Sequence, residues 1–280
     1  MLTFFHALLE NPFLLLALIA GCAASVAGGI IGSFVVVKRI VSLSGSIAHS
    51  VLAGMGLCVF LKTRFSIPFL LPLHGALGAG LLSAMLIGWI HMKYKEREDT
   101  AIALIWATGM SLGVVFLSLT PGYNAELLNF LFGNILWVSK PDIALLFALD
   151  LFILGTVFFF YRRFLAICFD ETQAYLQGLP VQGLYLVLLC LVAISVVLLI
   201  QIVGAILVIA LLAIPAAIAS TLTFRLSTMM CLATLLGALF NFLGMYLSYE
   251  WNWPSGATIS LVAAAAYGLS LLSNRRQHSL

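Results

Sequence analysis

Charge is scarce in this sequence. Asp, Glu, Lys and Arg make up 8% of its 280 residues, whereas they make up about 25% of a soluble domain. Four long stretches contain none of them: 11–37, 183–224, 226–249 and 251–274. An uncharged run of roughly 20 residues can cross a bilayer as a helix, because the backbone in lipid must satisfy its own hydrogen bonds. The sequence therefore predicts an all-α membrane protein without room for a soluble ATPase or receptor domain.

Motifs for catalysis and for cysteine chemistry are also missing. The five cysteines form no CxxC pair, so neither a disulfide nor a cysteine metal site is expected. The sequence contains no HExxH motif and no paired intramembrane aspartates. We therefore do not expect this chain to be an enzyme.

Nine apolar segments have the length of membrane spans and predict a polytopic helix bundle, a single domain over residues 1–280. They lie near 12–37, 46–61, 67–91, 101–119, 142–160, 183–201, 203–223, 228–248 and 256–273. The boundary around 201–204 is weak, so eight spans with a broken helix are the alternative. Segment 127–138 is too short to cross and is interrupted by Asn129, Gly133 and Asn134. It is expected to be re-entrant or interfacial, on the outer side.

Positive charge is distributed unequally between the two predicted faces of the bundle. With nine spans, ten of the 13 Lys and Arg residues fall on one face, and the other carries Lys62, Arg64 and Lys140. The positive-inside rule then places the N-terminus outside and the C-terminus in the cytoplasm. Nucleic acid is not an expected partner, because these cations are spread over several loops.

A short polar helix is predicted at 170–177, in a cytoplasmic loop between long apolar spans. Asp170 can cap its N-terminus, with Gln173 completing a pair that resembles a capping box, and Glu171 suits the positive end of the helix dipole. Gly178 can adopt the left-handed conformation after the last turn, and Pro180 prevents continuation. A folded helix in such a short loop indicates a docking element for a partner subunit.

The second span contains a narrow stripe of small and polar residues around His49. The spacing of four, three, four and three places on one helix face Ser42, Ser46, His49, Ala53 and Gly56. An ionisable residue within the membrane usually faces the bundle interior or a water-filled path, and imidazole commonly binds first-row transition metals. His49 is therefore either a residue of a metal path or a histidine that hydrogen-bonds to a neighbouring helix.

Two further polar residues are expected to matter less. Asp150 lies near the middle of the fifth span and needs a partner or water. It is either a path residue or part of an interhelical hydrogen bond. His91 lies near a cytoplasmic helix end and is expected to be solvated.

Four stretches together resemble the membrane permease subunit of the zinc, manganese and iron class of ABC importers. They are VKRIVSLSGSIAHSVLAGMG at 37–56, NFLFGNILWV at 129–138, FDETQAYLQGLPV at 169–181 and QIVGAILVIALLAIPAA at 201–217. The resemblance covers about 25–240 and keeps these motifs in order.

This resemblance implies a dimer of permeases, identical or paralogous, in the bacterial cytoplasmic membrane. It also implies a cytoplasmic ATP-binding subunit on each permease and an extracytoplasmic protein that delivers the divalent metal ion. The permease itself would hold no permanent cofactor, since ATP is bound by the partner. The implied coupling helix comprises 169–181, with contacts from Asp170, Glu171, Gln173, Ala174, Gly178, Leu179 and Pro180.

The same resemblance assigns His49 to the metal path. The family's usual aspartate, four residues before this histidine, aligns with Gly45 here, which leaves the identity of the metal open. The alternative function is an ion-coupled secondary transporter that needs no ATPase. Such transporters usually show inverted repeats and several intramembrane carboxylates. This sequence shows no clear internal repeat, and the only acidic residue in the interior of its spans is Asp150.

Overall fold

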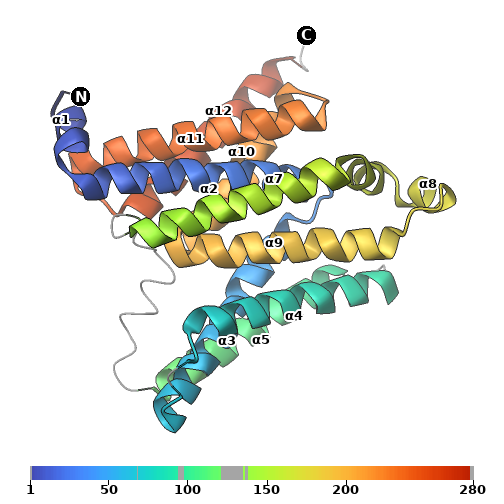
Figure 1. Ribbon diagram of the computed structural model, residues 1–280. Coiled ribbons are helices and arrows are strands. Elements are labelled where there is room, and N and C mark those ends of the chain that lie inside the picture. The colour runs from blue at the N-terminus through green and yellow to red at the C-terminus, as the bar shows by residue number, and fades with distance from the viewer. Residues whose placement is uncertain (1, 68, 94–97, 121–134, 136–137, 278–280) are drawn as a thin grey trace. The chain divides into compact units, whose positions relative to one another are not determined.

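The computed structural model describes residues 2–67, 69–93, 98–120, 135 and 138–277, and every regular element in these residues is a helix (Figure 1). The helices are α1 (Leu2–Glu10), α2 (Pro12–Val37), α3 (Val41–Phe65), α4 (Pro72–Lys93), α5 (Glu98–Ser118), α7 (Lys140–Phe169), α8 (Glu171–Leu176), α9 (Val181–Val203), α10 (Ala205–Leu222), α11 (Leu226–Trp251) and α12 (Ser255–Gln277). The segment predicted to be re-entrant, 127–138, lies outside the described residues apart from Ile135 and Val138.

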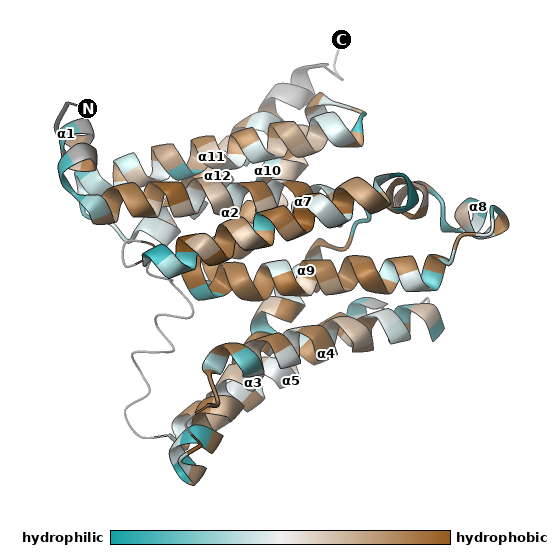
Figure 2. Cartoon of the chain, viewed as in Figure 1, coloured by the Kyte–Doolittle hydropathy of each residue, from teal (hydrophilic) through white to brown (hydrophobic). Residues whose placement is uncertain are grey.

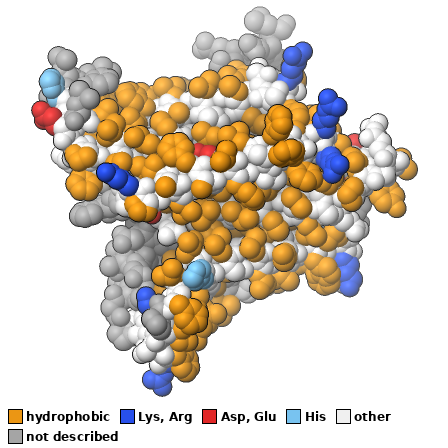
Figure 3. All heavy atoms as spheres, viewed as in Figure 1, with side chains coloured by type: hydrophobic (Ala, Val, Ile, Leu, Met, Phe, Trp, Pro, Cys, Tyr) orange, Lys and Arg blue, Asp and Glu red, His pale blue; other side chains and the backbone are white. Residues whose placement is uncertain are grey.

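Nine of the described helices are long and apolar enough to cross a membrane, which confirms the prediction of a polytopic bundle. Apolar residues run along their length (Figure 2) and cover most of the helix surface that faces the viewer in Figure 3. Phe158 and Phe159, for example, are 81% and 82% exposed. Such side chains suit contact with lipid, which is as apolar as a protein core.

Two span boundaries differ from the expected ones for local reasons. Helix α3 ends at Phe65, and the next residue, Ser66, has a left-handed conformation (φ 53°). Helix α4 begins at Pro72 rather than 67, because proline suits the first helical turn. Helix α7 continues to Phe169 instead of ending near 160. Its 30 residues extend about 45 Å, so it can cross a hydrocarbon layer of about 30 Å and project Arg162 and Arg163 beyond it.

A single residue, Gly204, separates α9 from α10. Its backbone has φ 88° and ψ 155°, a region that only glycine adopts readily. The helix therefore stops at Val203 and restarts at Ala205. Both interpretations include a break at this point, but α9 and α10 are each long and apolar enough to cross a membrane separately, which favours nine spans.

The chain forms two compact units. Unit 1 comprises Met1–Val37, Leu131–Leu154 and Ile202–Leu280, and unit 2 comprises Lys38–Phe130 and Gly155–Gln201. Helices α7 and α9 each contribute residues to both units. The predicted coupling helix and His49 both belong to unit 2.

Unit 1 is organised around α2, which packs against α10 and α11. Glycines allow this approach: a Cβ at Gly29 would overlap Thr234, and one at Gly32 would overlap the Leu212 carbonyl. A buried amide links α2 to α11. Asn241 Nδ2 donates to the Gly21 carbonyl at 3.1 Å and to Ser25 Oγ at 2.8 Å. Interhelical hydrogen bonds of this kind help to associate helices in lipid.

In unit 2, α3 packs against both α4 and α5. Gly54 of α3 and Gly75 of α4 approach so closely that a Cβ on either would overlap the backbone of the other. On the side of α5, Gly109 lies against Ser50, and Gly113 lies against Leu52. Small residues at helix contacts are typical of membrane bundles, and here they hold in place the helix that carries His49.

Candidate functional sites

Helix α8 begins as the sequence predicts, at a cap made by Asp170. This residue has an extended backbone (φ −153°, ψ 105°), and its Oδ1 accepts a hydrogen bond from the Gln173 backbone N–H at 3.0 Å. The other half of a capping box is not formed, because the Asp170 N–H donates instead to the Ala166 carbonyl of α7 at 3.0 Å. The chain therefore passes from α7 into α8 with its backbone groups at the junction satisfied.

The end of α8 is a Schellman motif. The Gly178 N–H donates to the Tyr175 carbonyl at 2.9 Å, and the Leu179 N–H donates to the Ala174 carbonyl at 3.1 Å. Gly178 has φ 78°, as the left-handed position requires. Pro180 directly precedes α9. These contacts give a helix of six residues a defined beginning and end.

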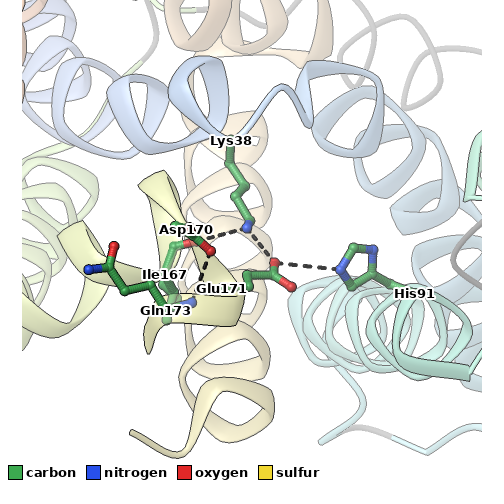
Figure 4. A network of polar contacts seen from close by, with 6 residues as sticks. All are labelled: Lys38, His91, Ile167, Asp170, Glu171 and Gln173. Atoms are coloured by element: carbon green, nitrogen blue, oxygen red, sulfur yellow. Dashed lines mark hydrogen bonds and ion pairs between the residues drawn. The ribbon is translucent and has the colours of Figure 1, made fainter. Parts of the chain in front are cut away.

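Helix α8 is attached to the rest of unit 2 through Glu171. Its carboxylate Oε1 accepts a hydrogen bond and ion pair from Lys38 Nζ (Figure 4), and the same ammonium donates to the Ile167 carbonyl at 2.8 Å. His91 Nε2, at the end of α4, lies 3.7 Å from Glu171 Oε1. Lys38 lies between the end of α2 at Val37 and the start of α3 at Val41, so this contact connects α8 with the short segment that leads into the helix that carries His49. We call the Lys38–Glu171 pair the latch.

His91 corrects an expectation. The sequence placed it in solvent, but its Nε2 is buried and its ring packs on Tyr185 with centroids 4.5 Å apart. Tyr185 is 2% exposed, and Lys38 Nζ lies 5.6 Å from its ring centroid. Tyr185 of α9 thus supports both Lys38 and His91, the two side chains that approach Glu171.

The outer surface of α8 exposes two large side chains beside polar ones. Of the helix residues, Ala174 is buried, whereas Tyr175 and Leu176 are 72% and 80% exposed. Phe169, just before the helix, is 68% exposed. A cavity of about 280 Å³ lies beside α8, and its lining includes Tyr175 of α8 and Gln182 of α9. Exposed aromatic and aliphatic groups on a rigid, capped helix are suited to burial by a partner protein.

The stripe predicted around His49 is not uniformly open. Ser42 is exposed and Ala53 is half-buried, but Ser46 is fully buried. Its Oγ donates to the Ile102 carbonyl of α5 at 2.9 Å. Gly56 lies against Gly113 and Phe116. Much of the stripe therefore serves as the contact surface between α3 and α5.

His49 itself is half-buried and stacks on Trp106 of α5, with ring centroids 4.6 Å apart and planes 14° from parallel. Within the described part of the chain its imidazole has no hydrogen-bond partner, and its nitrogens are not among the buried polar atoms that lack one. The Trp106 ring thus contacts the face of the imidazole, and the two ring nitrogens at its edge are left available to bind an ion. A hydrogen bond to a neighbouring helix, the alternative role, is not seen among these residues.

Within the part of the chain that the structure describes, no closed metal site surrounds His49. The described residues contain no group of three or more His, Cys, Asp or Glu that could hold a metal ion. In unit 1, Asp150 is 6% exposed, and its Oδ1 has no hydrogen-bond partner among the described residues. One imidazole with open coordination positions suits a passing ion better than a resident one.

Sequence reasoning missed two residues of these sites. Lys38 was read only as one of many cytoplasmic cations, and Trp106 was not singled out. A signal did exist for Lys38, since it is the first charged residue after an uncharged stretch of 27 residues (11–37). No signal marks Trp106, because its contact with His49 joins positions on separate helices.

Comparisons with known proteins agree on one family. The model of the ABC 3 transport family matches residues 10–274. A probable metal transport system membrane protein of Chlamydia trachomatis is 45% identical over 264 residues, which are 94% of this chain and 90% of that protein. The manganese transport system membrane protein MntC of Halalkalibacterium halodurans is 33% identical, over 98% of this chain and 91% of that protein. The solved structure of PsaBC from Streptococcus pneumoniae in complex with Fab superposes with a TM-score of 0.83 at 30% identity, covering 96% of this chain and 95% of that one.

Proposed function

The chain belongs to the ABC 3 transport family, as a multi-pass protein of the bacterial cytoplasmic membrane, and on this premise we propose that it is the permease subunit of an ATP-driven importer for a divalent transition-metal ion. The observation that carries the proposal is the capped helix α8 with its exposed Tyr175 and Leu176. Relatives named for metal and manganese transport support the choice of cargo. Zinc, manganese and iron are the candidate ions.

In this proposal the chain hydrolyses no ATP. A cytoplasmic ATP-binding subunit binds α8, a second permease completes the translocation unit, and an extracytoplasmic protein supplies the metal. Movement of the ATP-binding subunit pulls on α8, and the latch passes that movement to Lys38 and so to α3. His49 lies about two turns into α3, where it contacts the ion in transit.

The test is reconstitution of the permease with its ATP-binding subunit and its metal-binding protein in liposomes. We expect uptake of a zinc, manganese or iron isotope that requires ATP hydrolysis. Leu176→Asp should abolish co-purification of the ATP-binding subunit and uptake without lowering the amount of permease, whereas Leu176→Met should retain both. Uptake that an ion gradient drives without any ATPase would overturn the proposal in favour of a secondary transporter.

The orientation of the chain can be tested separately. A cysteine placed at Gln177, which is exposed at the end of α8, should react with a membrane-impermeant maleimide only after the cells are permeabilised. A cysteine placed at Thr63 should react in intact cells. Labelling of position 177 from outside would contradict both the orientation and the docking role of α8.

A further inference from the structure

The indole of Trp106 covers two positions on consecutive turns of α3. It stacks on the His49 ring at 4.6 Å, and its Cζ3 and Cη2 lie 3.5 and 3.8 Å from where a Cβ of Gly45 would be. All three residues belong to unit 2. Trp106 is 38% exposed, so the ring lies between the α3 surface and more open space.

A stack of this kind constrains the imidazole without occupying its nitrogens. Stacked aromatic rings keep each other in parallel planes, and this contact restricts rotation about the side-chain torsions of His49. Among the described residues no hydrogen bond competes for the His49 nitrogens. An imidazole fixed by its face in this way presents the same nitrogen to each ion that arrives, and this lowers the entropy lost on binding.

The contact with Gly45 limits which other ligands the site can have. Residues four apart on a helix lie on the same face, so a carboxylate at position 45 would be the nearest possible second ligand for an ion on His49. A methyl group at position 45 fits beside the indole, since 3.5 Å is ordinary contact. A longer side chain would have to share the space that the indole fills.

We propose that Trp106 is a positioning and selectivity residue for the transported metal ion, a role that rests on the proposed function. It orients the His49 imidazole and keeps the neighbouring position on α3 free of a second ligand. A site with one nitrogen ligand and no carboxylate favours zinc and iron over manganese, since affinity for nitrogen sites rises along that series and carboxylates suit manganese.

The first test separates stacking from space filling. Trp106→Phe keeps an aromatic face, whereas Trp106→Leu is apolar but cannot stack. The free energy of one stacked aromatic pair corresponds to about a 2- to 12-fold change in a binding constant, here that of the ion on His49. We therefore expect Trp106→Leu to raise the KM for zinc uptake by about that factor with little change in maximal rate, and Trp106→Phe to stay close to wild type. Equal behaviour of the two variants would overturn the positioning role.

The second test opens the covered position. Uptake of zinc and manganese is measured in competition for Gly45→Ala, Gly45→Asp, Trp106→Ala and the double variant Gly45→Asp/Trp106→Ala. Gly45→Ala should match wild type, because the methyl group fits. Only the double variant has room for a second oxygen ligand, so its uptake ratio should shift toward manganese by more than the two single shifts combined. A strictly additive ratio would overturn the selectivity role.

Uptake by the wild-type complex distinguishes a failure of the proposed function from a failure of the proposed role of Trp106. If the complete wild-type complex imports none of the three metals, the proposed function fails. If it imports metal while Trp106→Phe and Trp106→Leu behave alike, the function stands and the role of Trp106 fails.

Discussion

Helix α8 owes its beginning and end to its own polar groups, whereas α3 depends on the glycines of its neighbours. In α8 the Asp170 carboxylate and the Gly178 backbone define both ends, and only Ala174 is buried among the helix residues. Helix α3 has no side-chain cap at its N-terminus but is packed closely against α4 and α5. The proposed docking element is thus formed locally and left exposed, and the proposed path element is formed by packing across the bundle.

The largest effect should come from filling a close contact of α3. A Cβ at Gly75 of α4 would overlap the Gly54 carbonyl, and forced overpacking costs about 1–3 kcal/mol or more. Gly75→Ala should therefore lower the midpoint of thermal unfolding in detergent. Gly78→Ala on the same helix meets nothing within 4 Å and should raise it slightly, because alanine is favoured over glycine in a helix by about 0.5–1 kcal/mol. Equal midpoints would contradict the packing account of α3.

The latch connects the two regions, and breaking it should uncouple them. A hydrogen bond to a charged group is worth about 1.5–3 kcal/mol, and the 30% exposure of the Glu171 side chain places this pair at the lower end. Lys38→Met should reduce the metal imported per ATP hydrolysed by about tenfold, whereas Arg39→Met, the loss of an exposed neighbouring cation, should not.

The reversed pair Lys38→Glu/Glu171→Lys tests whether charge pairing matters. It should recover part of the loss seen in either single variant, but not all of it, because a glutamate at position 38 cannot donate to the Ile167 carbonyl. A double variant as defective as the worse single one would argue against the latch.

Gly178, at the end of α8, should tolerate substitution less well than the nearby Gly183 of α9. Gly178→Val places a branched side chain at φ 78°, which costs about 1 kcal/mol or more. We expect reduced uptake at a normal amount of permease in the membrane. Gly183→Ala, at an open position of α9, is the matched control. Normal transport by Gly178→Val would show that the shape of the α8 terminus is not needed.

The smallest effect should come from the N-terminal cap. Asp170→Ala removes the acceptor for the Gln173 N–H and should cost about 1 kcal/mol, visible as faster hydrogen exchange of the amides in 171–177. Gln173→Ala should leave exchange unchanged, because only its backbone takes part in the cap. If both variants speed exchange equally, the glutamine side chain contributes to the cap after all.

Prediction from sequence succeeded where the information is local. The limits of α8 follow from Asp170, Gly178 and Pro180, which act within a few residues of themselves, and the spans follow from runs of apolar residues. The His49–Trp106 stack could not be predicted, because it depends on how α3 and α5 pack. His91 was wrongly placed in solvent for the same reason. Its environment comes from Tyr185 of α9 and Glu171 of α8, which are remote in sequence.

The Asn241 contact between α2 and α11 has a consequence for biosynthesis. Its acceptors on α2 are made 220 and 216 residues before the amide that binds them. At a synthesis rate of about 5–20 residues per second, α2 spends roughly 10–45 s in the membrane before α11 exists. In the folded chain the Ser25 hydroxyl donates to the Gly21 carbonyl of its own helix at 2.7 Å, a contact that needs no residue outside α2 and so can form before α11 is made. The first span therefore reaches its final partner only after the eighth has left the ribosome.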